Sequence, residues 1–236
     1  MTLHIQRLQY DKSYKESFEV AHTHAMTLLS ALYQIKSKLD PSLTFGAGCR
    51  SGVCGSCAVL VNDKETLACV HKVSDDDVVG PLRYHTALRD LKVDKSKAHQ
   101  TLDKIHIPQS KSLDSSPDPK RVEKQSECIL CDSCYSACPV LAVNPDFLGP
   151  FALTKAYRYL GEVDNLVSLE RVQANGIWDC TLCGECTIAC PQGIDPKMDI
   201  TMLRSQSAKA GYGDPNYSEQ NFGAMDFGTP DFGGGF

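Results

Sequence analysis

The sequence has no apolar run close to the roughly 18 residues that a helix needs to cross a bilayer. It also lacks a long run of Lys and Arg, and its net charge of −5 predicts no basic surface for nucleic acid. The first residues do not follow the charged and then apolar pattern of a secretion signal, so we expect a chain made without a cleaved leader. These absences predict a soluble protein with no direct membrane span and no nucleic-acid partner.

Recognisable catalytic motifs are missing as well. The sequence contains no glycine-rich phosphate loop, no dinucleotide-binding fingerprint and no arrangement of Ser, His and Asp for nucleophilic catalysis. No histidine stands in a ligand pattern, and all are predicted to be surface or loop residues: His4, His22, His24, His71, His85, His99 and His106. No catalytic residue is therefore assigned, and we expect the substrate chemistry to lie on a partner.

Cysteine, by contrast, is abundant, with 12 residues in a chain of 236. In a secreted protein these cysteines would suggest disulfides, but a secretion signal is missing and the cysteine spacings are short and repeated. Metal ligation by three groups of four cysteines is the better interpretation.

The first group has the pattern C-x4-C-x2-C-x11-C and consists of Cys49, Cys54, Cys57 and Cys69. Its first three cysteines have the spacing by which plant-type ferredoxins hold a [2Fe–2S] cluster. Glycines in the same loop let the backbone approach a cluster with its amides facing the sulfides: Gly46, Gly48, Gly52 and Gly55. A structural zinc site is the alternative, but zinc sites commonly use two C-x2-C pairs. The first group therefore predicts a [2Fe–2S] cluster.

The other two groups share the pattern C-x2-C-x2-C-x3-C-P, which holds cubane clusters in bacterial ferredoxins. One run consists of Cys128, Cys131, Cys134 and Cys138 with Pro139, and the other of Cys180, Cys183, Cys186 and Cys190 with Pro191. In two-cluster proteins of this kind the fourth cysteine of each run binds the other cluster, because the proline turns the chain away. We therefore predict one [4Fe–4S] cluster on Cys128, Cys131, Cys134 and Cys190. A second cubane-type cluster is predicted on Cys138, Cys180, Cys183 and Cys186.

The first unit of the chain is predicted to be a small α+β domain over residues 1–97, from alternating and helical apolar periods. Its segments are, in order, strands over 3–8 and 14–20, a helix over 26–39, the cysteine loop 46–57, a strand over 58–61, a turn at Asn62 and Asp63, and an extended run over 66–70.

The second unit is predicted to be a mainly helical domain over residues 98–205. Residues 108–125 are rich in Pro, Ser, Asp and Lys, which predicts an exposed connection at its start. Apolar residues three or four apart over 151–172 indicate helix. Residues 206–236 repeat Phe-Gly without a periodic apolar face and are predicted to be a disordered tail.

This order of parts resembles the iron–sulfur subunit of succinate dehydrogenase and fumarate reductase over roughly residues 3–205. The likeness rests on the short gap before Cys69 and on the stretches 49–57, 89–91, 144–145, 149–158 and 190–193. The resemblance implies a β-grasp [2Fe–2S] ferredoxin-like domain followed by a helical bacterial-ferredoxin-like domain. It also implies that the [2Fe–2S] cluster is bordered by Gly48, Arg50, Gly52 and Gly55.

By this resemblance, the three clusters carry electrons between the flavin of an FAD-containing succinate or fumarate subunit and a membrane-associated quinone-side subunit. The complex would lie in the cytoplasm, on the inner face of the cell membrane through its partner subunits, although a chain without a leader can also travel with an exported partner. The sequence does not set the direction, whether succinate oxidation in the tricarboxylic acid cycle or fumarate reduction in anaerobic respiration. Cluster potentials differ by roughly a volt across proteins, so no list of residues decides between them.

Three residues depart from the family pattern, all of them around the third cluster. Cys183 stands where most members have an apolar or small residue and hold a [3Fe–4S] cluster, so we predict a second [4Fe–4S] cluster here. Members that reduce quinone directly have a tryptophan and a histidine where this sequence has Val143 and Thr181. The loss of both donors puts the usual quinone pocket in doubt. The pattern resembles the branch of the family in which a cysteine-rich subunit replaces the haem anchor.

Three other functions stay open. A free ferredoxin carrier would be shorter and more acidic and would not need the long second domain. The electron-transfer subunit of another flavin oxidoreductase, such as a thiol-linked fumarate reductase or a glycolate or glycerol-phosphate dehydrogenase, would typically carry CCG-type cysteine repeats in the same chain. A zinc-binding interaction module would be colourless, whereas iron–sulfur proteins are brown.

Overall fold

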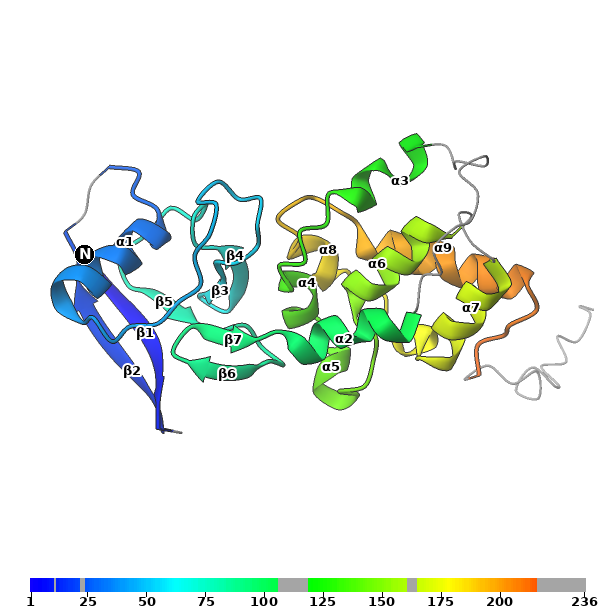
Figure 1. Cartoon of the computed structure of the whole chain (residues 1–236), viewed down its shortest axis with the longest axis horizontal. Coiled ribbons are helices and arrows are strands. Elements are labelled where there is room, and N and C mark those ends of the chain that lie inside the picture. Colours follow the sequence, from blue (N-terminus) through cyan, green and yellow to red (C-terminus); the bar gives the residue numbers. More distant parts are fainter. Residues whose placement is uncertain (11, 22–23, 106–118, 161–164, 216–236) are drawn as a thin grey trace, which may run out of the picture.

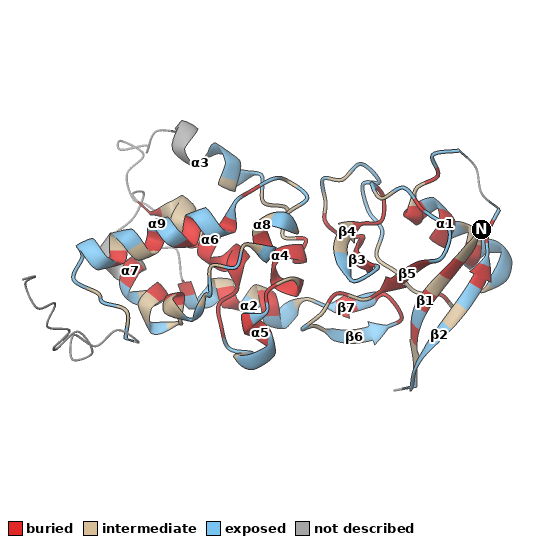
Figure 2. Cartoon of the chain, turned by 180° about the vertical axis from the view of Figure 1, so that it is seen from behind, coloured by how far each residue is buried: buried red, intermediate tan, exposed pale blue. Residues whose placement is uncertain are grey.

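The structure is a computed structural model, and it describes residues 1–10, 12–21, 24–105, 119–160 and 165–215. A sheet-rich amino-terminal half and a helical carboxy-terminal half lie end to end along the long axis (Figure 1). Each half has its own core of buried apolar side chains, drawn red in Figure 2. The α+β class, with a sheet before a helical region, is confirmed.

The amino-terminal half is built on a five-stranded sheet with the order β2-β1-β5-β3-β4. Its strands are β1 (Thr2–Gln9), β2 (Lys12–Glu19), β3 (Ala58–Val61), β4 (Lys64–Leu67) and β5 (Asp77–Gly80). β1 and β2 form an antiparallel hairpin, whereas β1 and β5 are parallel. Asn62 and Asp63 join β3 to β4 with positive φ angles of 49° and 63°, as a tight hairpin turn requires. The predicted strands and turn are confirmed, except that β4 already ends at Leu67.

A helical segment contributes most of the remaining core of this half. Helix α1 (Leu28–Gln34) continues as a π-helical turn, η1 (Ile35–Leu39), which confirms the helix predicted over 26–39 apart from its first residues. The Thr27 hydroxyl caps α1 by accepting the Ser30 N–H at 3.3 Å. A second hairpin, β6 (Thr86–Arg89) and β7 (Lys92–Asp94), was not predicted and leads toward the helical half (Figure 1).

Arg7 on β1 is buried and binds three carboxylates. Its Nε donates to Asp90 at 2.9 Å, and its Nη1 donates to Glu16 at 2.6 Å and to Asp40 at 2.5 Å. Asp90 also accepts the N–H of Thr44 at 2.8 Å. The network therefore ties β1 and the β6–β7 turn to the segment that leads into the cysteine loop.

Replacing Arg7 with methionine is expected to lower the free energy of unfolding by about 3–5 kcal/mol, because the buried Asp90 carboxylate loses its partner. Urea unfolding of the cluster-containing protein, followed by far-UV circular dichroism, measures this loss. The matched control is Lys12→Met, an exposed position on β2, which should change the free energy by less than about 0.5 kcal/mol. A similarly small effect of Arg7→Met would contradict the prediction.

The helical half consists of α2 (Ser96–Ile105), α3 (Pro119–Ser126), α4 (Ser133–Ser136), α5 (Val140–Val143), α6 (Pro150–Tyr159), α7 (Asn165–Ala174), the 3-10 turn η2 (Ile177–Asp179), α8 (Glu185–Ile188) and α9 (Pro196–Lys209). Helices α6 and α9 pack together at its centre (Figure 1). Phe151, Leu153, Ile200 and Leu203 are buried between the helices. Within the described ranges, every helix is too short or too polar to traverse a lipid bilayer.

The apolar period over 151–172 predicts helix, and α6 and α7 confirm it. Two boundary predictions in this half need correction. The connection predicted over 108–125 includes most of a helix, because α3 begins at residue 119, and residues 106–118 lie outside the described part. The tail predicted from residue 206 begins later, because α9 extends to Lys209, and residues 216–236 lie outside the described part.

Hydrogen bonds join the two halves. The Ser136 hydroxyl accepts the Arg83 N–H at 2.9 Å and donates to Glu65 at 2.8 Å. Gln192 Nε2 also crosses the junction and donates to the Gly52 carbonyl at 3.0 Å. These bonds place the first cysteine loop against the segments that carry the second and third groups.

Candidate metal centres

The first cysteine group lies at the edge of the sheet that faces the helical half. Its loop between η1 and β3 aims backbone donors at sulfur: the N–H groups of Ser51 and Val53 each lie 3.4 Å from Cys49 Sγ. The Cys49 N–H in turn lies 3.3 Å from Cys54 Sγ. Donors of this kind orient and stabilise thiolate ligands. The loop therefore has the donor arrangement of a cluster-binding loop.

The thiols of this group differ in their proton affinity. Hydrogen bonds from Ser51 and Val53 lower the pKa of Cys49 to about 6. Burial, together with the neighbouring Cys69, raises the pKa of Cys57 to about 11. A buried neutral thiol becomes a ligand when a bound cation replaces its proton, so this group suits a positively charged iron centre.

Backbone conformation in the loop explains its glycines. Gly52 and Gly55 have φ angles of +78° and +67°, which favour glycine, and Arg50 adopts a φ of +62° while its guanidinium lies over the Tyr33 ring. A Cβ on Gly48 would lie 2.7 Å from Cys54 Sγ. A Cβ on Gly55 would lie 2.8 Å from Cα of Cys131, so Gly55 lets the first loop touch the next cysteine run.

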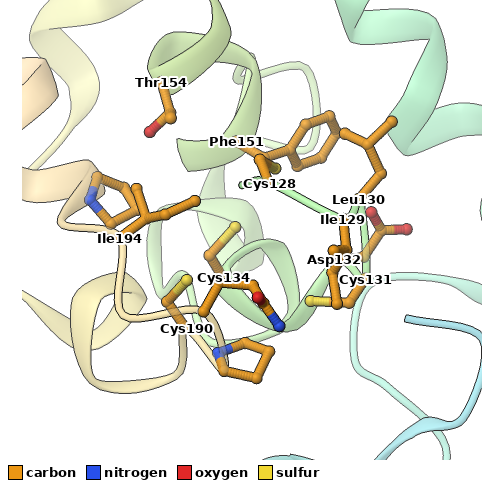
Figure 3. Close-up of a pocket in the computed structure, with 13 residues that line it drawn as sticks. Cys128, Ile129, Leu130, Cys131, Asp132, Cys134, Phe151, Thr154, Cys190 and Ile194 are labelled. Atoms are coloured by element: carbon orange, nitrogen blue, oxygen red, sulfur yellow. The ribbon is translucent and has the colours of Figure 1, made fainter. Parts of the chain in front are cut away.

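A cavity in the helical half is lined by the first cubane group: Cys128, Cys131, Cys134 and Cys190. Cys134 lies in α4 and Cys190 follows α8, and their side chains lie beside one another in Figure 3. Phe151 and Ile194 contribute apolar walls. The structure thus brings together the four cysteines that the crossed pattern predicts for one cluster.

A second cavity is lined by the remaining four cysteines: Cys138, Cys180, Cys183 and Cys186. Cys138 and Cys186 are buried, whereas Cys183 is exposed. Burial raises the pKa of Cys186 to about 12 and also raises the pKa values of Cys138 and Cys180. Four thiols line this cavity, and the raised pKa values keep three of them protonated at neutral pH unless a cation binds. Such a set fits an iron–sulfur cluster better than a polar ligand.

Three basic side chains surround Asp132, the residue after Cys131 in the first cubane group, and this charged cluster was not predicted. Lys95 Nζ donates to the Cys131 carbonyl at 2.7 Å and lies 3.8 Å from the buried carboxylate of Asp132. His99 Nε2 lies 3.1 Å and His85 Nε2 lies 3.8 Å from the same carboxylate. His85 was predicted to be a surface or loop residue. It lies in the loop before β6, but its side chain is 1% exposed and lies near the Tyr135 ring, and burial lowers its pKa. In the sequence, the one sign of this charged cluster was Asp132, an acidic residue directly after Cys131.

Of the two other atypical positions, only Thr181 lines the second cavity, and it is exposed. Val143 ends the short helix α5, whose first residue, Val140, lines the cavity, and its exposed fraction is 84%. An exposed aliphatic side chain and a threonine provide no indole or imidazole donor at this end of the molecule.

Asp199 on α9 is a buried acid behind the first cavity. Its Oδ1 accepts from Gln125 Nε2 at 2.7 Å. Its other oxygen faces the hydroxyl of Thr154, a cavity-lining residue, and neither atom has a well-formed hydrogen bond to any residue that the structure describes. Burial raises the pKa of Asp199 to about 6. The carboxylate form therefore opposes folding at neutral pH.

Asp199→Asn is expected to stabilise the protein by about 2 kcal/mol at pH 7. The unfolded acid ionises near pH 4, so the cost grows as pH rises from 4 to 6 and is then constant; below about pH 4 variant and parent should be equally stable. Urea unfolding at pH 4, 5, 6 and 7 measures the difference, with the exposed Asp103→Asn as control. A stabilisation that does not change with pH would contradict the prediction.

Comparisons with known proteins agree with this architecture. A family model described as "2Fe-2S iron-sulfur cluster binding domain" matches residues 2–100, and one described as "4Fe-4S dicluster domain" matches residues 124–194. The solved structure of the Mycobacterium smegmatis Sdh1 complex in the apo form contains a chain with the same fold, with a TM-score of 0.80 at 23% identity over 90% of this chain and 97% of that chain. Fold and sites thus define an iron–sulfur protein with a [2Fe–2S] domain and a dicluster [4Fe–4S] domain.

Sequence relatives narrow the class to one family. The fumarate reductase iron–sulfur subunit of Haemophilus influenzae is 35% identical over 82% of this chain and 86% of its own length. The 8-methylmenaquinol:fumarate reductase iron–sulfur subunit of Wolinella succinogenes is 34% identical, over 88% of this chain and 72% of its own length. The mitochondrial succinate dehydrogenase [ubiquinone] iron–sulfur subunit 2 of rice is 32% identical over 75% of this chain. The chain belongs to the family of iron–sulfur subunits of fumarate reductase and succinate dehydrogenase, as its sequence motifs predicted.

Proposed function

We propose that this chain carries electrons between the flavin of a succinate- or fumarate-converting partner and a quinone-side partner. The observation that carries the proposal is the pair of cavities, each lined by four cysteines in the crossed combination. The bound clusters supply one-electron redox chemistry. The ligand sets would be Cys49, Cys54, Cys57 and Cys69 for [2Fe–2S], Cys128, Cys131, Cys134 and Cys190 for the first [4Fe–4S], and Cys138, Cys180, Cys183 and Cys186 for a second [4Fe–4S].

Contacts between the cysteine groups support a linear route. Gly55 in the first loop lies against Cys131, so the first two groups meet across the junction of the halves. Cys134 lies in α4 and Cys186 in α8, two short helices that pack together, so the second and third groups also adjoin. The order of the sites in space would then be the order of electron transfer, with units over 1–97 and 98–205 carrying one and two clusters. The first residues of α2 support this boundary, because Ala98 already belongs to the helical core.

The third site would pass electrons to a partner other than a quinone bound in the usual pocket. Cys183 and Thr181 are exposed at this site, and Val143 at the end of α5 is exposed as well. A protein surface carrying its own redox centre needs no indole or imidazole donor here. We therefore propose a cysteine-rich quinone-side subunit, which would hold this chain at the inner face of the cell membrane.

Purification of the native complex tests the function. We expect this chain to co-elute with an FAD-containing subunit in size-exclusion chromatography and to contain about ten iron atoms, the sum for one [2Fe–2S] and two [4Fe–4S] clusters. Succinate should reduce the clusters in the complex but not in the isolated chain, because the substrate chemistry lies on the partner. A brown, monomeric chain with no flavoprotein partner would instead support a free ferredoxin.

A further inference from the structure

Arg204 on α9 contacts the turn η2 and the residue that follows it, Cys180, where the third cysteine group begins. Its Nη2 donates to the carbonyl oxygen of Cys180 at 2.6 Å and to that of Ile177 at 3.0 Å, and its Nε donates to Ile177 O at 3.2 Å. The guanidinium carbon lies 5.1 Å from the centre of the Trp178 ring, within cation–π distance. Two carbonyls and one ring face thus hold a permanent cation against the first cysteine of the second run.

Lys95 makes a comparable contact at the first cubane group, where it donates to the carbonyl of Cys131, the second cysteine of its run, at 2.7 Å. The surroundings of the two cations differ. Lys95 lies 3.8 Å from the buried carboxylate of Asp132, which offsets its charge. The partners that the structure gives to Arg204 are two carbonyls and an aromatic ring, so none of these contacts offsets its positive charge at the third site.

We propose that Arg204 is a positioning residue that fixes Cys180 and raises the reduction potential of the third cluster relative to the first cubane cluster. The inference rests on the proposed ligand set Cys138, Cys180, Cys183 and Cys186. One-electron reduction adds one negative charge to this site, the electron coming from the preceding cluster, and no bond is formed or broken. A fixed cation next to Cys180 stabilises the added charge and thereby favours electron flow toward the third site.

Two substitutions separate the charge of Arg204 from its geometry. Arg204→Gln removes the charge but keeps an amide donor, whereas Arg204→Lys keeps the charge but loses the planar fork that spans both carbonyls. The probe is redox potentiometry of the purified complex, followed by EPR, which gives the midpoint potential of each cluster. Lys209→Gln, an exposed position at the end of the same helix, is the control for the loss of one positive charge.

In Arg204→Gln the equilibrium constant for reduction of the third cluster should fall about tenfold, which corresponds to about 59 mV for one electron. The midpoint of the [2Fe–2S] cluster should not change. In Arg204→Lys the midpoint potential of the third cluster should stay close to that of the parent, but the EPR line shape of this cluster should change. Lys209→Gln should match the parent in both.

An unchanged third midpoint in Arg204→Gln, or an equal shift of all three clusters, would overturn the proposal. An equally large shift in Arg204→Lys would overturn it too, because packing rather than charge would then set the potential. Iron analysis separates these failures from a failure of the proposed function. A parent protein that contains no third cluster refutes the ligand set, whereas a full complement with an unmoved midpoint refutes the role of Arg204.

Discussion

Replacing Cys190 with alanine is expected to remove the first cubane cluster and to unfold the helical half. Cys190 follows α8, whereas the other three cysteines of this cavity precede or lie in α4, so a bound cluster would join segments far apart in the chain. Cys134, Cys138 and Cys186 also belong to the core of this half. In metal sites of this kind the binding free energy, on the order of 10 kcal/mol for structural zinc, is folding free energy. Its loss would match the entire stability of a typical domain, about 5–15 kcal/mol.

In Cys190→Ala, far-UV circular dichroism and limited proteolysis measure whether the helical half is folded. Iron and sulfide assays measure how many clusters are lost. The matched control is Cys49→Ala, which removes an exposed cysteine from the other half. This control should lose the [2Fe–2S] cluster while its helical signal and its protease resistance across α6 and α9 persist. If Cys190→Ala loses its cluster but keeps both signals, the cluster is not what holds the helices together.

Local spacing made the cysteine groups predictable. Three ligands of each cluster lie within a few residues of one another, so C-x4-C-x2-C and C-x2-C-x2-C are visible in the sequence. The crossing of Cys138 and Cys190 follows from the prolines after them, and the structure gathers the same two sets around two cavities. Whether these sets bind the clusters proposed here stays a prediction.

Residues that act from a distance were not predictable. Lys95 joins β7 to α2 and Arg204 lies in α9, so both are outside the cysteine runs, and a single Lys or Arg carries no spacing signal. The burial of the His85 side chain was not predicted, because it depends on packing between the loop before β6 and the helical half. Helix α3 was missed because its composition is polar, and its visible anchor, the bond from Gln125 to Asp199, joins residues far apart in sequence.

Cys183→Ala is expected to convert the third cluster from [4Fe–4S] to [3Fe–4S]. Cys183 is the exposed member of its group, so an alanine there removes the ligand of one iron and leaves the buried thiols Cys138 and Cys186 in place. EPR of the oxidised protein should show an intense [3Fe–4S] signal that the parent lacks, and the iron content should fall by about one atom per chain. Cys186→Ala is the matched control, and because that side chain lies in the core it should lose the whole cluster.

The EPR spectrum of the untreated parent protein decides whether Cys183 is a ligand of the third cluster. If untreated parent protein already shows the [3Fe–4S] signal at full occupancy, Cys183 is not a ligand, and the variant will not differ from it. The exposed Thr181 and Val143 would then be the remaining reasons to place a different partner at this end of the chain. If the signal arises only in Cys183→Ala, one cysteine accounts for the cluster type. Electron transfer from the variant to the quinone-side partner should then slow, because the cluster that faces this partner has changed its charge and potential.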